Sequence, residues 1–160
     1  MALPPKKVLL ALAAVPLLYF GGRAAWRALA SDATRIRWLL QDEVSAFNGG
    51  NVGDVLAGFA DGYRDTTAGI DRNDLHQCLL YVLLQRSQGM HYRAELHDDT
   101  AIEPDGNTAR ASFGLALDSG MPAQQRPRWE LQVDAELAKT PAGWQFVHST
   151  HRTLAGTPPR

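Results

Sequence analysis

Two side chains that can move a proton stand two residues apart in the segment GYRDTT, namely Tyr63 and Asp65. Residues two apart on a strand point to the same face, so a short strand here presents a phenol and a carboxylate side by side. A phenol can polarise a carbonyl while a carboxylate gives or takes a proton. The same residues are also ordinary members of a half-buried strand, and the pattern leaves both interpretations open.

A histidine occupies the closing segment, WQFVHSTHR. Alternation over this predicted strand assigns one face to Trp144, Phe146, His148 and Thr150. A histidine that faces a cavity can act as a general base or as a hydrogen-bond donor. A buried histidine with satisfied hydrogen bonds is the simpler interpretation, and the pattern favours it. His151 falls on the opposite face, so the two histidines cannot chelate one metal ion.

The sequence assigns no catalytic residue, no metal site and no cofactor. Cys78 is the one cysteine, which excludes an internal disulfide, and its place on the apolar side of a predicted helix favours a core thiol over a nucleophile. The run His97-Asp98-Asp99 can attract a cation, but a strand end or bulge explains it more simply. There is no phosphate-binding loop, no G-x-S-x-G motif and no aromatic and basic platform.

Composition predicts one folded domain. The chain has 160 residues, of which 45% are hydrophobic and 21% charged, a balance that supports one sizeable core. The formal net charge is −1, so we expect no nucleic-acid partner.

The first thirty residues differ in kind from the rest. Lys6 and the lysine after it precede an uncharged apolar run, Val8 to Phe20. This run is shorter than the roughly 20 residues of a spanning helix and has the length of a signal-peptide core. Trp26, between two arginines, is typical of an interfacial anchor.

We therefore expect residues 1–30 to be an N-terminal membrane anchor. The protein would then be a single-pass protein of a bacterial inner membrane, with its domain in the periplasm or outside the cell. One alternative is a signal segment cleaved near Ala30, which would give a secreted protein. The other is a buried helix of a soluble protein.

Three helices are predicted after Ser31, which can cap the first. Its apolar stripe contains Ile36, Leu39, Leu40, Val44 and Phe47. The sequence NGGN at 48–51 ends this helix and a short second one follows. Asp71 is a good cap for the third helix. Its predicted inward residues are Leu75, Cys78, Leu79, Val82 and Leu83. Further apolar residues, Leu80, Tyr81 and Leu84, predict that this helix is buried on more than one side.

Everything after Met90 is predicted to form strands. Two segments alternate strictly, with inward residues Ala109, Ala111, Phe113, Leu115 and Leu117 in the first and Trp129, Leu131, Val133, Ala135 and Leu137 in the second. One apolar face and one wet face are typical of an antiparallel sheet packed on one side. The fold class is therefore α+β, with three N-terminal helices packed on a strongly curved antiparallel sheet and a hydrophobic helix before them. Residues 154–160 are predicted to be a disordered tail.

This order of elements resembles the nuclear transport factor 2-like superfamily, which includes SnoaL-like cyclases and ketosteroid isomerases. The segment FNGGNVGDVLAGFADGYRDTTAGIDRNDL is similar to that superfamily's helix, glycine break, second helix, short strand and third-helix cap. The ending GWQFVHSTHR resembles its closing strand. The resemblance covers residues 31–153 and implies a cystatin-like cone around a pocket, commonly in a dimer. Members include enzymes, ligand binders and structural modules, so the fold alone does not give the function.

If the cone holds a pocket, the candidate lining residues are Tyr63, Asp65, Trp144, Phe146 and His148. We expect a membrane-tethered, non-catalytic module that binds a small apolar ligand or a protein, as a homodimer. The first alternative is an isomerase, dehydratase or cyclase in which His148 or Asp65 shuttles a proton and Tyr63 donates a hydrogen bond. The second is a structural subunit of an envelope assembly.

Overall fold

The structure is a computed structural model, which describes residues 30–120 and 128–158. The predicted anchor, apart from Ala30, lies outside these residues. Within the two described ranges, no helix combines the length and the apolar character needed to cross a bilayer.

Three helices lie in the predicted places: α2 (Asp32–Gly49), α3 (Val52–Ala57) and α4 (Arg72–Ser87). The Ser31 hydroxyl accepts a hydrogen bond from the backbone N–H of Thr34 at 3.2 Å and so caps α2. Gly50, at φ 74°, ends the same helix in the left-handed conformation that glycine adopts freely. Asp71 and Asp74 form a capping box at the start of α4.

Seven strands form one sheet: β1 (Phe59–Asp65), β2 (Ile70–Asp71), β3 (His91–Leu96), β4 (Ala101–Asp105), β5 (Thr108–Gly120), β6 (Arg128–Thr140) and β7 (Gly143–Ala155). Their order is β2-β1-β7-β6-β5-β3, and β4 also pairs with β5. The sheet is mixed, because β1 runs parallel to β7. The prediction of an antiparallel sheet is wrong at this pair. No local turn links β1 to β7, so nothing in the local sequence sets their direction.

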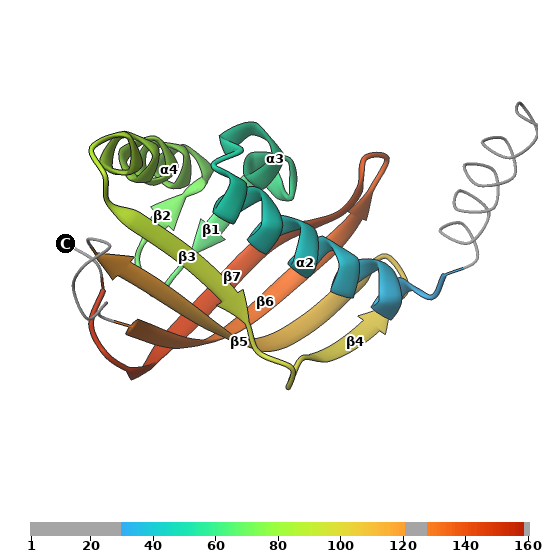
Figure 1. Cartoon of the computed structure of the whole chain (residues 1–160). Coiled ribbons are helices and arrows are strands. Elements are labelled where there is room, and N and C mark those ends of the chain that lie inside the picture. The colour runs from blue at the N-terminus through green and yellow to red at the C-terminus, as the bar shows by residue number, and fades with distance from the viewer. Residues whose placement is uncertain (1–29, 121–127, 159–160) are drawn as a thin grey trace, which may run out of the picture.

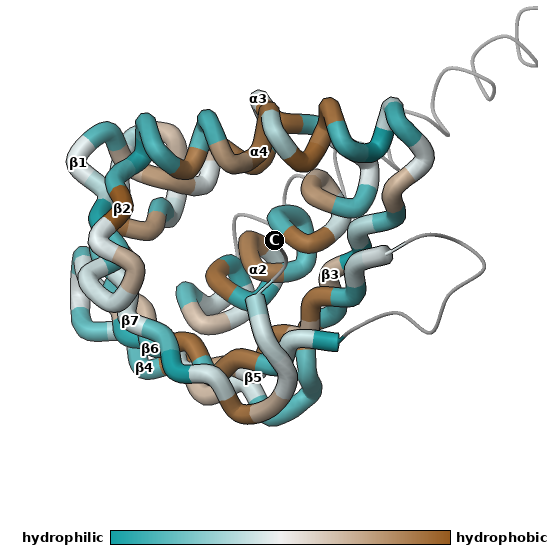
Figure 2. The backbone as a smooth tube through the Cα atoms, turned by 90° about the vertical axis from the view of Figure 1, so that its left-hand side faces the viewer, coloured by the Kyte–Doolittle hydropathy of each residue, from teal (hydrophilic) through white to brown (hydrophobic). Residues whose placement is uncertain are grey.

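The sheet curls around α2, as Figures 1 and 2 show, and α3 and α4 cover the remaining side. The predicted inward faces of β5 and β6 are confirmed, since the buried core contains Ala109, Ala111 and Phe113 of β5 and Ala135 and Leu137 of β6. Together with α2 they enclose the core, in which Ile36 and Leu137 are fully buried. The result is an α+β cone with one apolar interior.

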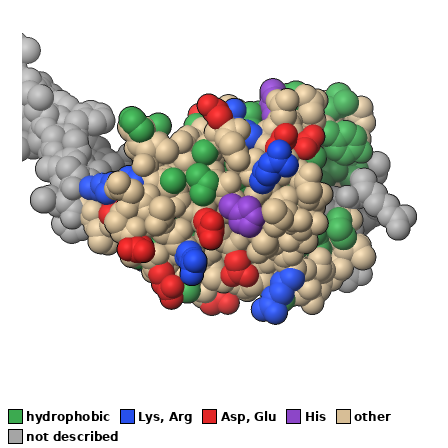
Figure 3. All heavy atoms as spheres, turned by 180° about the vertical axis from the view of Figure 1, so that it is seen from behind, with side chains coloured by type: hydrophobic (Ala, Val, Ile, Leu, Met, Phe, Trp, Pro, Cys, Tyr) green, Lys and Arg blue, Asp and Glu red, His purple; other side chains and the backbone are tan. Residues whose placement is uncertain are grey.

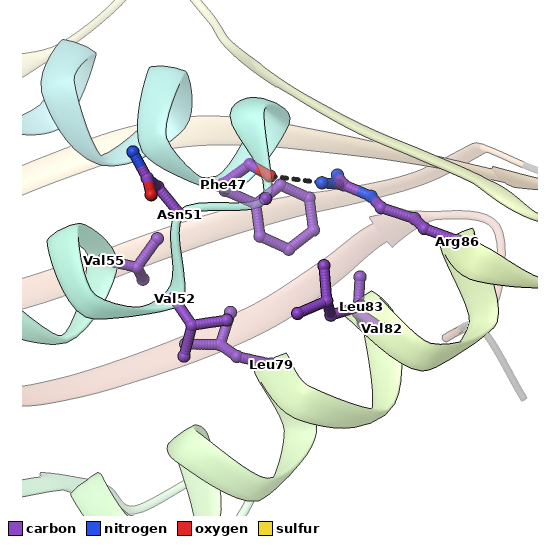
Figure 4. A pocket seen from close by; sticks show the side chains of 9 residues that line it. Phe47, Asn51, Val52, Val55, Leu79, Val82, Leu83 and Arg86 are labelled. Atoms are coloured by element: carbon purple, nitrogen blue, oxygen red, sulfur yellow. Dashed lines mark hydrogen bonds between the residues drawn. The ribbon is translucent and has the colours of Figure 1, made fainter.

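Two arginines of α4 fix this helix to the rest of the fold. Arg86 donates to the carbonyl oxygens of Phe47 and Tyr92, both at 2.7 Å, and Figure 4 shows the first of these bonds at the junction of the helices. Arg72 donates to the carbonyl oxygen of Phe59 at 3.0 Å. The pocket at this junction has a volume of only about 10 Å³, which is space for no more than one water molecule. The helix is thus held in one orientation.

The opposite face of α4 is open to solvent. Leu80, Tyr81 and Leu84 are 41–56% exposed there, and Cys78 is exposed as well. Leu83, which lines the junction with α2, is also 43% exposed. The expectations that α4 is buried on more than one side and that Cys78 is a core thiol are therefore wrong in this chain. The physical reason is that the sheet wraps α2, while α4 contacts the cone along a single side.

Candidate functional site

The interior of the cone contains a cavity of about 290 Å³. Helices α2, α3 and α4 and strands β1, β3, β5, β6 and β7 contribute to its wall. The wall is almost entirely apolar; its residues are Leu40, Glu43, Val44, Phe47, Val55, Phe59, Tyr63, Leu75, Leu79, Ala94, Leu96, Phe113, Leu115, Leu117, Trp129, Leu131, Val133, Ala135, Phe146 and Ser149. The lining residues with polar side-chain atoms are Glu43, Tyr63, Ser149 and Trp129, and the indole Nε1 of Trp129 donates to Thr153 at 3.0 Å. A cavity with a few polar groups in an apolar wall is the usual form of a small-molecule site.

Glu43 is the carboxyl group of this wall. It lies on α2 in the middle of the apolar stripe, one turn from Leu39, Leu40 and Phe47. Its Oε2 atom is buried and has no hydrogen-bond partner. Burial, together with the smaller effects of the nearby carboxylates of Asp42 and Asp54, raises the pKa of Glu43 to about 8. At neutral pH the group is therefore mostly a protonated acid.

Gly58, at the end of α3, provides the space in which the Glu43 carboxyl lies. A Cβ atom at this position would overlap Oε1 of Glu43 and would stand 3.3 Å from Cδ1 of Leu39. The backbone of Gly58 has φ −74° and ψ −10°, which any residue can adopt. Glycine is needed here for space, because the carboxyl group occupies the place of a side chain.

A second polar group stands where β1 meets β7. The Tyr63 hydroxyl is 2.7 Å from the Ser149 hydroxyl, and Ser149 donates to Oδ2 of Asp65 at 2.6 Å. Nδ1 of His151 is 3.1 Å from the same oxygen. Oδ1 of Asp65 accepts from the backbone N–H of Ala68 at 2.8 Å. We call Tyr63, Asp65, Ser149 and His151 the β1–β7 cluster.

The hydrogen bonds of the β1–β7 cluster set its charges. Burial alone would raise the pKa of Asp65, but the bonds from Ala68, Ser149 and His151 outweigh it and hold that pKa below its usual value. Burial raises the pKa of the Tyr63 phenol, so the phenol stays protonated at neutral pH. Ser149 bonds to Asp65 and not to His151, so these residues do not form a nucleophile–histidine–carboxylate relay.

The fold is shared with solved structures of low sequence identity. A nuclear transport factor 2-like superfamily protein from Salmonella enterica serovar Typhimurium aligns with a TM-score of 0.62 and 16% identity, over 79% of this chain and 94% of that one. A Novosphingobium aromaticivorans protein provisionally assigned as a scytalone dehydratase aligns with a TM-score of 0.67 and 11% identity, over 79% of this chain and 87% of that one. A ketosteroid isomerase-like protein from Erwinia carotovora atroseptica aligns with a TM-score of 0.57 and 15% identity, over 79% of this chain and 99% of that one.

The chain has the cystatin-like fold of nuclear transport factor 2-like proteins. No family model and no curated protein sequence matches it. The comparisons with solved structures therefore identify the fold of this chain and do not identify an activity.

His148 lies on the outer surface of the cystatin-like cone. Glu136 pairs with His148 while the next residue, Leu137, pairs with Phe146, so Val147 is an extra residue in β7. This bulge reverses the alternation. His148 and Thr150 line a groove on the outer face, and Ser149 and His151 point inward. The predicted inward position of His148 is thus wrong, and the groove that it lines also contains Glu103, Arg110, Asp134 and Glu136. Figure 3 shows a face of the molecule on which acidic and basic side chains are interspersed.

The other four predicted pocket residues lie on the inner side of the cone. Phe146 and Tyr63 line the cavity, and Asp65 lies behind Tyr63 in the β1–β7 cluster. Trp144 is buried at the far end of β7 instead, where its Nε1 donates to Oδ1 of Asp32 at 3.2 Å, and it does not line the cavity.

Sequence reasoning missed Glu43, although a signal for it was present. The residue falls inside the 36–47 apolar stripe, at a three- or four-residue step from three of its members. A charged residue in the middle of a buried stripe is costly unless it has a role or a partner. Ser149 had no comparable signal, because only the bulge turns it inward.

No three His, Cys, Asp or Glu side chains come together as metal ligands within residues 30–120 and 128–158.

Proposed function

We propose that the cone binds a small, largely apolar molecule and that Glu43 transfers a proton to it as a general acid. The observation that carries this proposal is that Glu43 lines an apolar cavity and that its carboxyl group has a buried Oε2 without a hydrogen-bond partner. A carboxyl group whose pKa lies near the working pH is suited to acid–base catalysis. The reaction class that this favours is isomerisation or dehydration of an oxygen-containing substrate.

Tyr63 and Ser149 have a supporting role in this proposal. Both bring hydroxyl groups to the cavity wall, and both are already bonded within the β1–β7 cluster. They therefore form a fixed polar group in the wall, in addition to Glu43. We infer that they orient the bound molecule, while Glu43 carries the proton.

One observation favours a non-catalytic binding module as the second candidate. The hydrogen-bonding groups of the β1–β7 cluster satisfy one another, which leaves Glu43 without a partner acid or base in the cavity wall. In this case Glu43 donates a hydrogen bond to a ligand and no bond is made or broken.

Hydrogen exchange at carbon distinguishes the two candidates. The full chain is incubated in D₂O with α-tetralone, a small two-ring ketone, and exchange of the hydrogens next to the carbonyl is followed by NMR. In this step Glu43 protonates the carbonyl oxygen while a solvent water molecule takes the proton from the neighbouring carbon, and the enol that forms takes up deuterium when it returns to the ketone. A general acid accelerates such a step, typically by a factor of about 100 or more. We expect acceleration by the wild type, a loss above about pH 8 as Glu43 ionises, and none with E43Q. If α-tetralone binds and exchanges no faster than with E43Q, the binding module is the better description.

We also propose that residues 1–30 tether the domain to a membrane. The support is the apolar run from Val8 to Phe20 with Trp26 beyond it. The test is fractionation of cells that express the full chain or the chain without residues 1–30. The full chain should stay in the membrane fraction after an alkaline carbonate wash, and the shortened chain should not.

A further inference from the structure

We propose that the molecule held in the cone is uncharged, has about two rings, and carries one oxygen acceptor that receives a hydrogen bond from Glu43. This inference rests on the proposed function, because it takes the same cavity as the site. It adds the charge, the polarity and the size of the molecule.

The charge follows from the residues around the cavity. Among the residues that the structure describes, no lysine, arginine or histidine lines it. An anionic ligand would lose its hydration there without gaining a counter-charge, which is strongly unfavourable. A cationic amine would need an ionised Glu43, but the apolar wall disfavours this form of the carboxyl group. An uncharged molecule avoids both costs.

The polarity follows from the hydrogen bonds already made. Tyr63 and Ser149 are bonded to each other, and Ser149 also donates to Asp65. Oε2 of Glu43 is the buried side-chain oxygen without a partner in the described part of the chain. A protonated carboxyl group has one O–H to donate. The complementary ligand therefore offers one acceptor, such as a ketone or ether oxygen, on an apolar body.

The size follows from the volume. A cavity of about 150 Å³ lined by aliphatic and aromatic side chains is sufficient for benzene. The cone holds about 290 Å³, which is room for a molecule with about two six-membered rings.

A matched series of probes tests this class. Tetralin, α-tetralone, aminotetralin and tetralin carboxylate share one two-ring body and differ only in the group they carry. Binding of each to the full chain is measured by equilibrium dialysis, with the same buffer and detergent in both chambers. The chains compared are the wild type, E43Q, which keeps an N–H donor without the acid, and E43L, which removes both.

At about pH 6 we expect wild type to bind α-tetralone roughly threefold to tenfold more tightly than tetralin, the usual worth of one net hydrogen bond. The advantage should persist in E43Q and vanish in E43L. It should also vanish at about pH 10, where an ionised carboxyl group has no O–H to donate. Tetralin binding should change little with pH, which controls for unfolding.

Tighter binding of the carboxylate or the amine than of the ketone would overturn the inference, and so would equal binding of α-tetralone and tetralin. These outcomes are separate from failure of the proposed function. If E43Q retains the preference for the ketone but wild type shows no hydrogen exchange at carbon, the ligand class stands and the general acid does not.

Discussion

Two carboxyl groups of the cone interior, Glu43 on α2 and Asp65 on β1, are shifted in opposite directions. Burial raises the pKa of both when considered alone. Asp65 receives hydrogen bonds from Ala68, Ser149 and His151, which reverse the effect. Oε2 of Glu43 receives none. Burial therefore does not fix the charge of a carboxyl group in this fold; its hydrogen-bond partners do.

The opposite pKa shifts of Asp65 and Glu43 correspond to two different roles, one structural and one functional. The Asp65 carboxylate holds β1 and β7 together at their parallel junction, and its oxygens are committed to that task. Glu43 holds nothing together, yet its carboxyl lies in the apolar wall over a glycine that leaves it room. A buried group that stabilises nothing is a candidate for function.

The largest effect is expected from Asp65→Ala. This change leaves the Ala68 N–H, Ser149 and His151 without their acceptor, which should lower the free energy of unfolding by about 2–4 kcal/mol at neutral pH. Urea unfolding measures it. Because the pKa of Asp65 is lowered in the fold, the carboxylate stabilises the fold above the usual aspartate pKa, about 4. The gap between wild type and variant should therefore shrink as pH falls below that value, and a constant gap would contradict the assignment.

Gly58→Ala should have the next largest effect. The new methyl group overlaps the Glu43 carboxyl and must push it aside, at a cost of about 1–3 kcal/mol in stability. A displaced carboxyl group reaches water, so the pKa of Glu43 should fall toward its ordinary value. The matched control is Gly62→Ala on β1, where an added Cβ meets no atom within 4 Å. An unchanged Glu43 titration in Gly58→Ala would show that the glycine does not position the carboxyl group.

The smallest effects are expected from the two histidines of β7. His151→Ala loses the bond to Asp65 and should cost about 1 kcal/mol. His148→Ala lies on the outer face and should stay within about 0.5 kcal/mol of wild type. Thermal unfolding of both variants tests the bulge at Val147. If β7 alternated without this bulge, His148 would point inward and His151 outward, and His148→Ala would then be the more destabilising change.

Most of the fold could be predicted from the sequence, because its signals are local. The stripe of α2, the cap at Asp71 and the alternation of β6 each follow from neighbouring residues. The site was harder to predict, because it depends on contacts between distant segments. One extra residue at Val147 moves His148 out of the cone and Ser149 into it. Alternation was enough to predict Tyr63 and Phe146 as lining residues, whereas Glu43, a charge within an apolar stripe, left a local signal that was missed.

The most direct test of this account is the titration of the Glu43 carboxyl in the full chain. Carboxyl carbon NMR, assigned by comparison with E43Q, gives the pKa, and unfolding of both chains across the same pH range gives the linked stability. We expect a midpoint near 8. A carboxyl group with a raised pKa binds more protons when folded, so the stability of the wild type should fall relative to E43Q as pH rises from about 4.5 to 8. A midpoint near 4.5, with equal pH dependence in both chains, would mean that Glu43 is an ordinary solvated carboxylate and that the cone has no acid.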